Sequence, residues 1–493
     1  MRERLLPGGN GARGHLGALL IVVIALGACA TVAPRTQLAP APESPAHEVS
    51  LPRAASTPAP PQLQIPQELL APGASISLAK VVAIALANNP ATRASYFQAR
   101  AAAALAGSKN APYYPAVSAS ALYSREKNSS QNSLVDTPQD IYGPAVTLSY
   151  LLLDLGGRAA NADDARLGLI AADWTHNATI QNVVLAVETT YVAYLDARAR
   201  LDAARVTVKQ TQTTLEAATT RHKAGVATIA DVLQAKTARS QAELALQSAE
   251  GEVLALRGAL ATAMGLPANT PYDVGMLPAD VPLDRATDAV EALIVAAQAN
   301  RPDLEAIRAL AAKANAHVRA VRSDGLPNLA LNAGAGRGYV SPTPGSSPSD
   351  TWSATALLTV PLFTGFATTY NVRKAEADAA AAQAQADALE QEVILQVWQS
   401  YYAFKTATQL VRTSRDLLAS AEESERVALG RYREGVGTII DLLTAQATLA
   451  GARAEEIRAR SGWYVALAQL AHDTGSAPPL EQQIAITKEG GKP

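Results

Sequence analysis

The feature that most constrains this chain is a fifteen-residue motif that it carries twice. "RHKAGVATIADVLQA" begins at residue 221 and "RYREGVGTIIDLLTA" at residue 431, 210 positions later, and eight of the fifteen positions are identical. "ALANNPATRA" (86–95) resembles "AQANRPDLEA" (298–307) at an offset of 212. Because a single loop-length change explains offsets that differ by two, we infer that a unit of about 200 residues is duplicated, far longer than a solenoid repeat.

The duplication divides the chain into two equivalent copies. The segments are 75–271 for the first copy, 272–285 for a linker, 286–475 for the second copy and 476–493 for a C-terminal tail. In each copy, two stretches of alternating polarity precede two proline-free stretches, which predicts two strands followed by two helices. The expected strands cover 114–126, 141–154, 327–340 and 351–364, and the expected helices cover 158–224, 228–264, 367–434 and 438–473.

The two longest expected helices carry a heptad pattern of apolar residues. The positions are Val187, Tyr191, Tyr194, Leu201 and Val208 in the first, and Val397, Tyr401, Phe404, Val411 and Leu418 in the second, with identical steps of 4, 3, 7 and 7. Apolar residues at this spacing form a seam that packs against another helix. Each of these long helices is expected to be roughly 100 Å long. The shorter helices at 228–264 and 438–473 are the expected partners, so each copy predicts a long antiparallel hairpin.

The four expected strands present one apolar face and one face of small polar residues. In the first strand, Val117 and Tyr123 belong to the apolar row, whereas Ser118 and Ser120 belong to the polar row. A soluble sandwich is the alternative, but its outward face normally carries Lys and Glu. Strands in lipid cannot leave edges unpaired, and a membrane barrel needs about eight strands or more. Two chains would close a plugged barrel of eight strands, whereas three chains, with three times four strands, would leave a lumen.

The duplicated motif reads as the turn that joins the two helices of each hairpin. Each copy has an arginine in the last helical turn, then a glycine in the left-handed position, then a threonine N-cap with an aspartate three residues later. These residues are Arg221, Gly225, Thr228 and Asp231 in the first copy, and Arg431, Gly435, Thr438 and Asp441 in the second. Two interpretations of the aspartates stay open: capping alone, or also a ring of carboxylates at a pore mouth that favours cations.

The N-terminus is typical of an exported lipoprotein. Residues 1–28 combine arginines with the short apolar run "LGALLIVVIALGA", which predicts a signal peptide. "LGAC" places Cys29, the single cysteine of the chain, in a bacterial lipobox, so we expect it to be the lipidated first residue of the mature protein. The alternatives are an inert thiol or an ordinary cleavage site. Residues 29–74 are rich in proline and alanine, which predicts a lipid-anchored tether.

The composition excludes several other classes of function. Lys plus Arg (42) nearly balance Asp plus Glu (44), and no basic run indicates a nucleic-acid partner. The six histidines are scattered, without a pair at metal-ligand spacing. No G-x-S-x-G, P-loop or H-E-x-x-H motif is present in the sequence. We therefore expect neither an enzyme nor a bound metal or cofactor.

With its duplicated strand–strand–helix–helix unit, its "G-V-x-T-I-x-D-[VL]-L" tips and its lipobox, the chain resembles the TolC-type outer-membrane efflux channels, and most of all the lipoprotein branch typified by OprM and NodT. The resemblance covers about 75–475. It implies a mainly α fold with a membrane β portion, in which long antiparallel coiled-coil hairpins form an α-barrel continuous with a 12-strand trimeric β-barrel. It also implies a homotrimer in the outer membrane of a Gram-negative cell, with a periplasmic tube.

The resemblance also implies partners and roles for individual residues. Asp441 falls where the family has an aspartate that lines the closed periplasmic aperture. The family has a second aspartate of this ring three residues later, and Thr444 occupies that position here. Tyr432 and Asp231 occupy positions that resemble a hydrogen-bond pair that closes neighbouring hairpins in the family. Some members have a second latch made by an arginine, but Gly437 occupies that position here, so we expect this latch to be absent. A periplasmic adaptor (membrane fusion) protein, itself bound to an inner-membrane pump of the resistance-nodulation-division type, is expected to contact the tips. The tip residues are Gly225, Val226, Thr228, Gly435, Val436 and Thr438.

The leading hypothesis is thus a passive exit duct that carries small toxic compounds or drugs out of the cell. A duct of a type I protein secretion system with the same architecture is the related alternative. A non-conducting structural or adhesive coiled coil at the cell surface is the alternative from another class. The sequence does not name the exported compound, because a wide, water-filled duct keeps little imprint of its cargo.

Overall fold

The structure is a computed structural model that describes residues 75–127, 138–275, 281–283, 289–341 and 348–476. The predictions for the signal peptide, Cys29, the tether and nearly all of the C-terminal tail lie outside these residues. The described helices are α2 (Leu78–Asn88), α3 (Pro90–Ser108), the 3-10 turn η2 (Ala111–Tyr113), α4 (Gly157–Lys223), α5 (Ile229–Ala263), α6 (Val290–Asn300), α7 (Pro302–Ser323), α8 (Ala367–Arg433) and α9 (Ile439–Asp473). The described strands are β1 (Ser75–Ile76), β2 (Ala116–Glu126), β3 (Gln139–Leu153), β4 (Asp273–Val274), β5 (Asn328–Ser341) and β6 (Ser349–Thr359).

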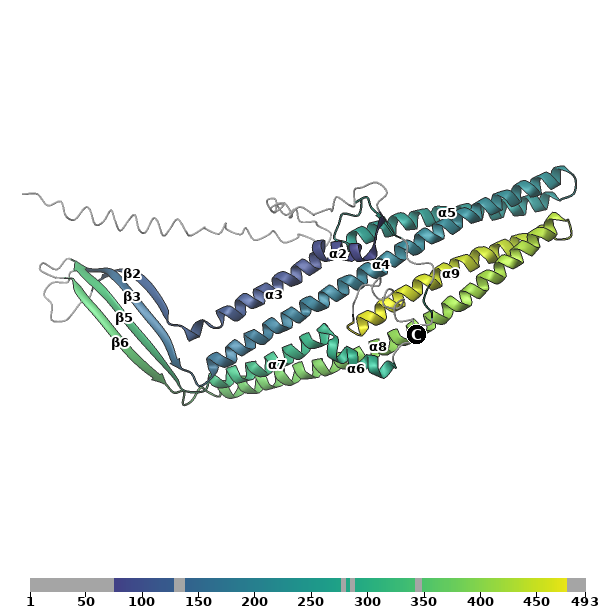
Figure 1. Ribbon diagram of the computed structural model, residues 1–493. Helices are drawn as coiled ribbons and strands as arrows, with labels where there is room; N and C mark the ends of the chain where they lie inside the picture. The colour runs from purple at the N-terminus through teal and green to yellow at the C-terminus, as the bar shows by residue number, and fades with distance from the viewer. Residues whose placement is uncertain (1–74, 128–137, 276–280, 284–288, 342–347, 477–493) are drawn as a thin grey trace, which may run out of the picture. The chain divides into compact units, whose positions relative to one another are not determined.

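The two copies of the sequence repeat fold in the same order. The first runs α2–α3–β2–β3–α4–α5 and the second α6–α7–β5–β6–α8–α9 (Figure 1). α4 and α8 have 67 residues each, and α5 and α9 have 35 each. All four begin and end within one residue of the predicted bounds, because the glycines and threonines that flank them specify the ends locally. Within the described ranges, no helix is both long and apolar enough to span a bilayer.

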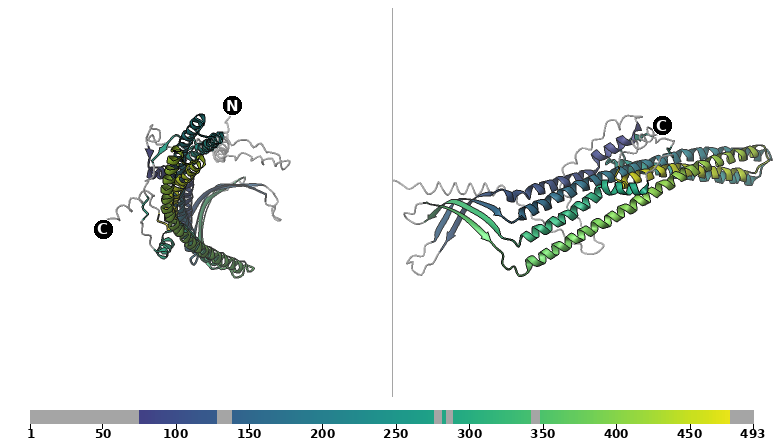
Figure 2. Two further views of the ribbon diagram at one scale, coloured as in Figure 1. Left: turned by 90° about the vertical axis from the view of Figure 1, so that its right-hand side faces the viewer. Right: turned by 60° about the horizontal axis from the view of Figure 1, so that its bottom comes forward.

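Four strands form one antiparallel sheet in the order β2-β3-β5-β6, and they share a common curve in Figure 2. β3 pairs with β5, so the central pairing of the sheet joins the two copies. The register aligns small or polar residues across one face and apolar residues across the other. The polar row is Ser118, Thr147, Gly334 and Ser353, and the apolar row is Val117, Leu148, Ala333 and Ala354. The predicted two-faced pattern is therefore confirmed strand by strand.

The last strand is shorter than predicted. We expected it to reach residue 364, but β6 ends at Thr359. Pro361 follows two positions later and has no backbone N–H to donate to a ladder, so the pairing stops before the predicted end. The two outer strands, β2 and β6, each have one edge without a strand partner among the described residues.

The predicted helical hairpins are confirmed, and the structure adds the partners of their remaining length. α5 packs against α4 and α9 against α8, but each return helix is only half as long as its partner. α3 and α7 pack along the rest of α4, and α7 also packs on α8. The heptad positions Val187, Tyr191 and Tyr194 of α4 are buried, as the seam predicts.

The largest hydrophobic cluster lies where α2, α4, α5, α8 and α9 meet. Trp463 is buried there and donates its indole N–H to Thr408 Oγ1 at 3.1 Å. The phenol of Tyr191 donates to the carbonyl of Gly275 at 2.6 Å, next to the short parallel pair of β1 and β4. Burial of large aromatic rings with satisfied polar atoms anchors the centre of the helical bundle, so the hairpin ends are the parts free of this core.

Candidate functional site: the paired hairpin tips

Both hairpin tips fold with the same backbone geometry. Gly225 and Gly435 each have φ of +79°, the left-handed region that a side chain disfavours. Val226 N–H donates to the carbonyl of Arg221 and Val436 N–H to that of Arg431, each at 3.0 Å. These bonds satisfy carbonyls that the end of a helix would otherwise leave without partners.

The next helix of each hairpin begins with a complete capping box. The Asp231 carboxylate accepts from Thr228 N–H at 2.9 Å, and Asp231 N–H donates to Thr228 Oγ1 at 3.2 Å. Asp441 and Thr438 make the same two bonds at 3.2 and 3.1 Å. The predicted capping role of both aspartates is therefore confirmed, whereas their role at a pore mouth stays a prediction.

The two tips pack against each other within one chain, at the same end of the bundle (Figure 1). A small hydrophobic cluster joins them, formed by Ala218 of α4, Ala235 of α5, Tyr432 of α8, and Ile439 and Leu442 of α9. Each of the four long hairpin helices thus contributes a buried side chain. The second tip supplies the large residues and the first supplies alanines, which let the helices approach closely.

Arg221 adds a polar contact between the tips. Its Nη1 donates to the carbonyl of Tyr432 at 3.0 Å and to that of Arg433 at 3.5 Å. The guanidinium carbon lies 5.0 Å from the centroid of the Tyr432 ring. A cation over an aromatic face and against the C-terminal carbonyls of a helix is favourable for both electrostatic reasons.

The structure brings Tyr432 and Asp231 close without joining them. The Tyr432 hydroxyl is buried and has no hydrogen-bond partner among the described residues. Burial raises the pKa of Tyr432, the nearby Arg221 opposes that shift and Asp231 adds to it. The Asp231 carboxylate instead caps its own helix. The predicted closing bond between these two residues is thus not formed within the single chain, and it remains a prediction for an assembly.

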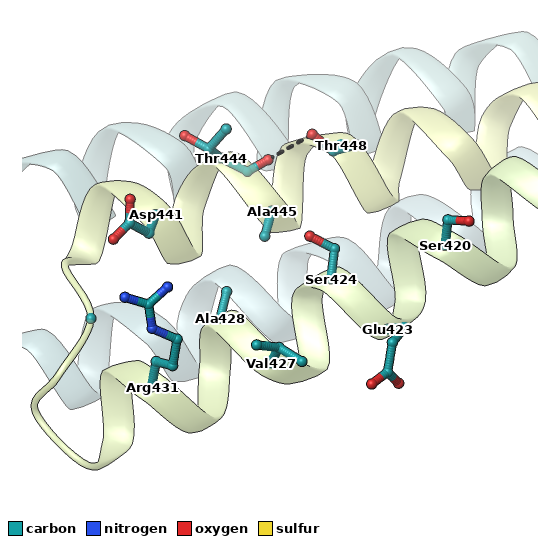
Figure 3. Close-up of a pocket in the computed structure, with 11 residues that line it drawn as sticks. Ser420, Glu423, Ser424, Val427, Ala428, Arg431, Asp441, Thr444, Ala445 and Thr448 are labelled. Atoms are coloured by element: carbon teal, nitrogen blue, oxygen red, sulfur yellow. Dashed lines mark hydrogen bonds between the residues drawn. The ribbon is translucent and has the colours of Figure 1, made fainter.

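Asp441 lies in an open groove between α8 and α9, with a volume of about 590 Å³ (Figure 3). Its lining includes the departures from the family pattern, Thr444 and Gly437, together with small residues of α8. Figure 3 shows the Arg431 guanidinium and the Asp441 carboxylate pointing toward each other. The backbone N–H and hydroxyl of Thr438 hold the pKa of Asp441 below its ordinary value, and Arg431 lowers it further.

The outermost residues of both turns are exposed. Val226 and Val436 have exposed fractions of 65% and 69%, and Thr228 and Thr438 are exposed beside them. Gly225 and Gly435 lie between these residues and the preceding helix. Apolar side chains at the extreme end of a helical hairpin, with no packing partner of their own, suit contact with another protein. The six predicted adaptor-contact residues are therefore accessible.

Sequence reasoning missed the contact of Arg221 with the second tip, since it assigned this residue only to the dipole of its own helix. It also missed a buried polar pair deeper in the hairpins, in which Gln446 Nε2 donates to Thr214 Oγ1 at 3.1 Å. The expected seam gave no signal for this pair, because the next seven-residue step after Val208 is Leu215 rather than Thr214. Among the described residues, no group of His, Cys, Asp and Glu could hold a metal ion.

Comparison with known proteins places these features in one family. The sequence model of the family described as outer membrane efflux protein matches residues 81–266 and 293–476. The two matched ranges coincide with the two structural copies.

Individual relatives share about a quarter of their residues with the chain. It is 29% identical to Protein CyaE of Bordetella pertussis over 386 residues, which is 78% of this chain and 80% of that protein. It is 25% identical to the antibiotic efflux pump outer membrane protein ArpC of Pseudomonas putida over 410 residues, which is 79% of this chain and 82% of that protein.

Solved structures share the fold. A membrane protein from Pseudomonas aeruginosa superposes with a TM-score of 0.73 at 25% identity, covering 81% of this chain and 93% of that one. The outer-membrane channel OprN superposes with a TM-score of 0.74 at 20% identity, covering 81% of this chain and 90% of that one. The latter likeness concerns the fold alone.

Proposed function

The chain belongs to the outer membrane efflux protein family, and we propose that it is the outer-membrane exit duct of a tripartite efflux system. The observation that carries this proposal is the sheet. It has one apolar and one small polar face, and the outer strands β2 and β6 lack a second strand partner among the described residues. Backbone edges in lipid must be paired, so three chains would close twelve strands around a water-filled lumen.

The two hairpins of each chain would then build the periplasmic tube, as six hairpins in a trimer. Their exposed tips, with Val226 and Val436 outermost, would bind a periplasmic adaptor (membrane fusion) protein. An inner-membrane pump of the resistance-nodulation-division type would supply the energy, and the duct would conduct passively. The name of the relative ArpC specifies an antibiotic efflux pump, which supports small organic compounds as the cargo.

We place the gate of this duct at the tips, with Asp231, Tyr432 and Asp441 as its residues. The buried Tyr432 hydroxyl has no acceptor within the described ranges, and Asp231 lies close enough to raise its pKa. A small rearrangement on assembly would join them and hold the hairpins together. Asp441, exposed in its groove and ionised at neutral pH, would line the aperture and favour cations.

Outer-membrane location agrees with the family, and we propose that Cys29 adds a lipid anchor. Lipidation of the mature N-terminus would tether each chain to the membrane through residues 29–74. Mass spectrometry of the purified protein tests this directly. Acyl chains on Cys29 are expected, and an unmodified Cys29 or cleavage at another site would contradict the anchor.

Planar-bilayer recordings test the duct itself. Detergent-extracted protein is expected to have the mass of three chains and to give discrete conductance steps. A double variant, Tyr432→Phe with Asp231→Asn, should raise the single-channel conductance, because it removes the closing bond. A protein that stays a folded, electrically silent monomer would overturn the duct, whereas a conducting trimer whose double variant is unchanged would overturn only the gate.

A further inference from the structure

Among the polar links between the two hairpins that the described residues form, the one made by Arg221 lies nearest the tips. It belongs to the last turn of α4, but its guanidinium donates to the carbonyl of Tyr432, at 3.0 Å, and to that of Arg433. Both carbonyls lie in the last turn of α8, the negative end of a 67-residue helix. A fixed positive charge is most favourable at such an end, so this contact ties the end of α8 to the neighbouring hairpin.

The same guanidinium also covers the Tyr432 ring, 5.0 Å from its centroid. The turn at Gly435 lies beside it, since a Cβ added there would be in ordinary van der Waals contact with Arg221 Nη2, at 3.6 Å. The planar fork therefore contacts a ring, two carbonyls and a turn of the second hairpin at once. Lysine carries the same charge but has neither the plane nor the fork that this combination requires.

The duplicated residue does not repeat the contact. Arg431 occupies the equivalent position in the second copy, but within the described part of the chain it makes no hydrogen bond to the first hairpin. It lies beside Asp441 of its own hairpin, whose pKa it helps to lower. The arginine of the first copy thus contacts the second hairpin, whereas the arginine of the second copy makes no such contact with the first. This difference is a property of the tertiary arrangement rather than of the repeated motif.

Other polar links join the hairpins farther from the tips, among them two between the middle parts of the helices. Gln446 Nε2 donates to Thr214 Oγ1 at 3.1 Å, and Arg453 Nη1 donates to Gln210 Oε1 at 3.2 Å. The Thr214–Gln446 pair is buried, whereas Arg221 is partly exposed. A movement that parts the hairpins from their ends would break the Arg221 contact first and leave the inner links in place.

We propose that Arg221 is an intrachain latch that holds the second hairpin tip against the first and thereby sets how readily the duct opens. The inference rests on the proposed function. Parting the tips removes the guanidinium from the ring and from both carbonyls at once, while water replaces it. The latch therefore favours the closed arrangement without being needed for folding, since the core around Trp463 and Tyr191 lies elsewhere in the bundle.

The test compares four proteins in planar bilayers: wild type, Arg221→Gln, Arg221→Lys and the control Arg205→Gln. Arg205 is exposed, lies on the same helix and, among the described residues, pairs with Asp202, so its replacement removes the same charge without touching the second hairpin. We expect Arg221→Gln to spend about tenfold more time open than wild type, because it loses charged hydrogen bonds and a cation–π contact. Arg221→Lys should fall between the two, and Arg205→Gln should match wild type.

Native mass and thermal unfolding show whether each variant remains folded and assembled. A conducting wild type with an Arg221→Gln variant of unchanged open time overturns the latch. If Arg221→Lys has the same open time as wild type while Arg221→Gln has a longer one, the positive charge alone explains the effect, and the proposed latch geometry is overturned. If the wild type itself is silent, the proposed function fails, and that result is distinguishable from failure of the latch.

Discussion

The two hairpin tips carry nearly the same sequence and the same turn, yet they differ in what they bury. Ile229 and Ile439 each begin a return helix directly after a threonine cap. Ile229 has an exposed fraction of 58%, whereas Ile439 has 4%. The motif therefore specifies the backbone conformation of the turn, but the burial of its side chains depends on how the neighbouring hairpin packs against it.

The position after the duplicated arginine shows the same difference. The first tip has His222 there, exposed, with Nδ1 3.0 Å from the carbonyl of Ala227. The second has Tyr432, buried under Arg221. A residue that can hydrogen-bond locally suits the exposed copy, and a large ring suits the buried one. Substitutions within a repeat thus mark where the two copies have acquired different neighbours.

The largest expected difference between the tips is in core packing. Replacing Ile439 with alanine should lower the free energy of unfolding by about 2–4 kcal/mol, because it leaves a cavity in the cluster between the hairpins. The matched change Ile229→Ala should cost less than about 1 kcal/mol, since the side chain is exposed. Urea unfolding in detergent, followed by circular dichroism, measures both. Equal losses would contradict the difference in burial.

The caps should behave alike in the two copies. Thr228→Ala and Thr438→Ala each remove a side-chain acceptor from a helix start, so each should cost about 1 kcal/mol of local stability. Hydrogen exchange of the Asp231 and Asp441 amides, which donate to these threonines, reports the loss at each tip. A clearly larger effect in one copy would show that the turns are not equivalent after all.

The smallest expected effect is a pH dependence at the second tip. The pKa of Asp441 lies below its ordinary value of 3.8, chiefly because Thr438 donates to its carboxylate. A carboxyl with a lowered folded pKa stabilises the fold above its unfolded pKa, and this contribution is lost as the pH falls through the folded value. Wild type should therefore be more stable than Asp441→Asn at pH 6, with a difference that shrinks toward pH 3, as thermal unfolding would measure. A stability difference that does not change with pH would contradict a lowered pKa of Asp441 in the folded protein.

Local patterns in the chain predicted the helices, the turns and the two faces of the sheet. Helix ends came out within one residue because glycine, threonine and aspartate act on the backbone beside them. Alternation of polarity likewise predicted which strand residues share a face, as the rung from Ser118 to Ser353 confirms. The strand predicted to reach residue 364 was too long, because Pro361 lacks an N–H donor and pairing stops before it.

The contacts between distant helices were not predictable in the same way. Arg221 and Arg431 occupy the same position of the duplicated motif, yet Arg221 contacts the other hairpin whereas Arg431 lines a groove of its own hairpin. Arg221 contacts residues more than 200 positions away in the chain, and such contacts follow from how whole helices pack. Likewise, α3 and α7 cover the length of α4 that the return helix leaves free.

What the chain encodes locally is the unit: a duplicated hairpin with a capped tip and a pair of two-faced strands. These features depend on interactions between residues a few positions apart, where backbone geometry and side-chain periodicity act directly. The packing of one unit on the other made two nearly identical tips unequal, burying Ile439 and Tyr432 while leaving Ile229 and His222 in contact with solvent. That asymmetry comes from tertiary packing rather than from the motif, because a helix has several faces and its neighbours determine which face is buried.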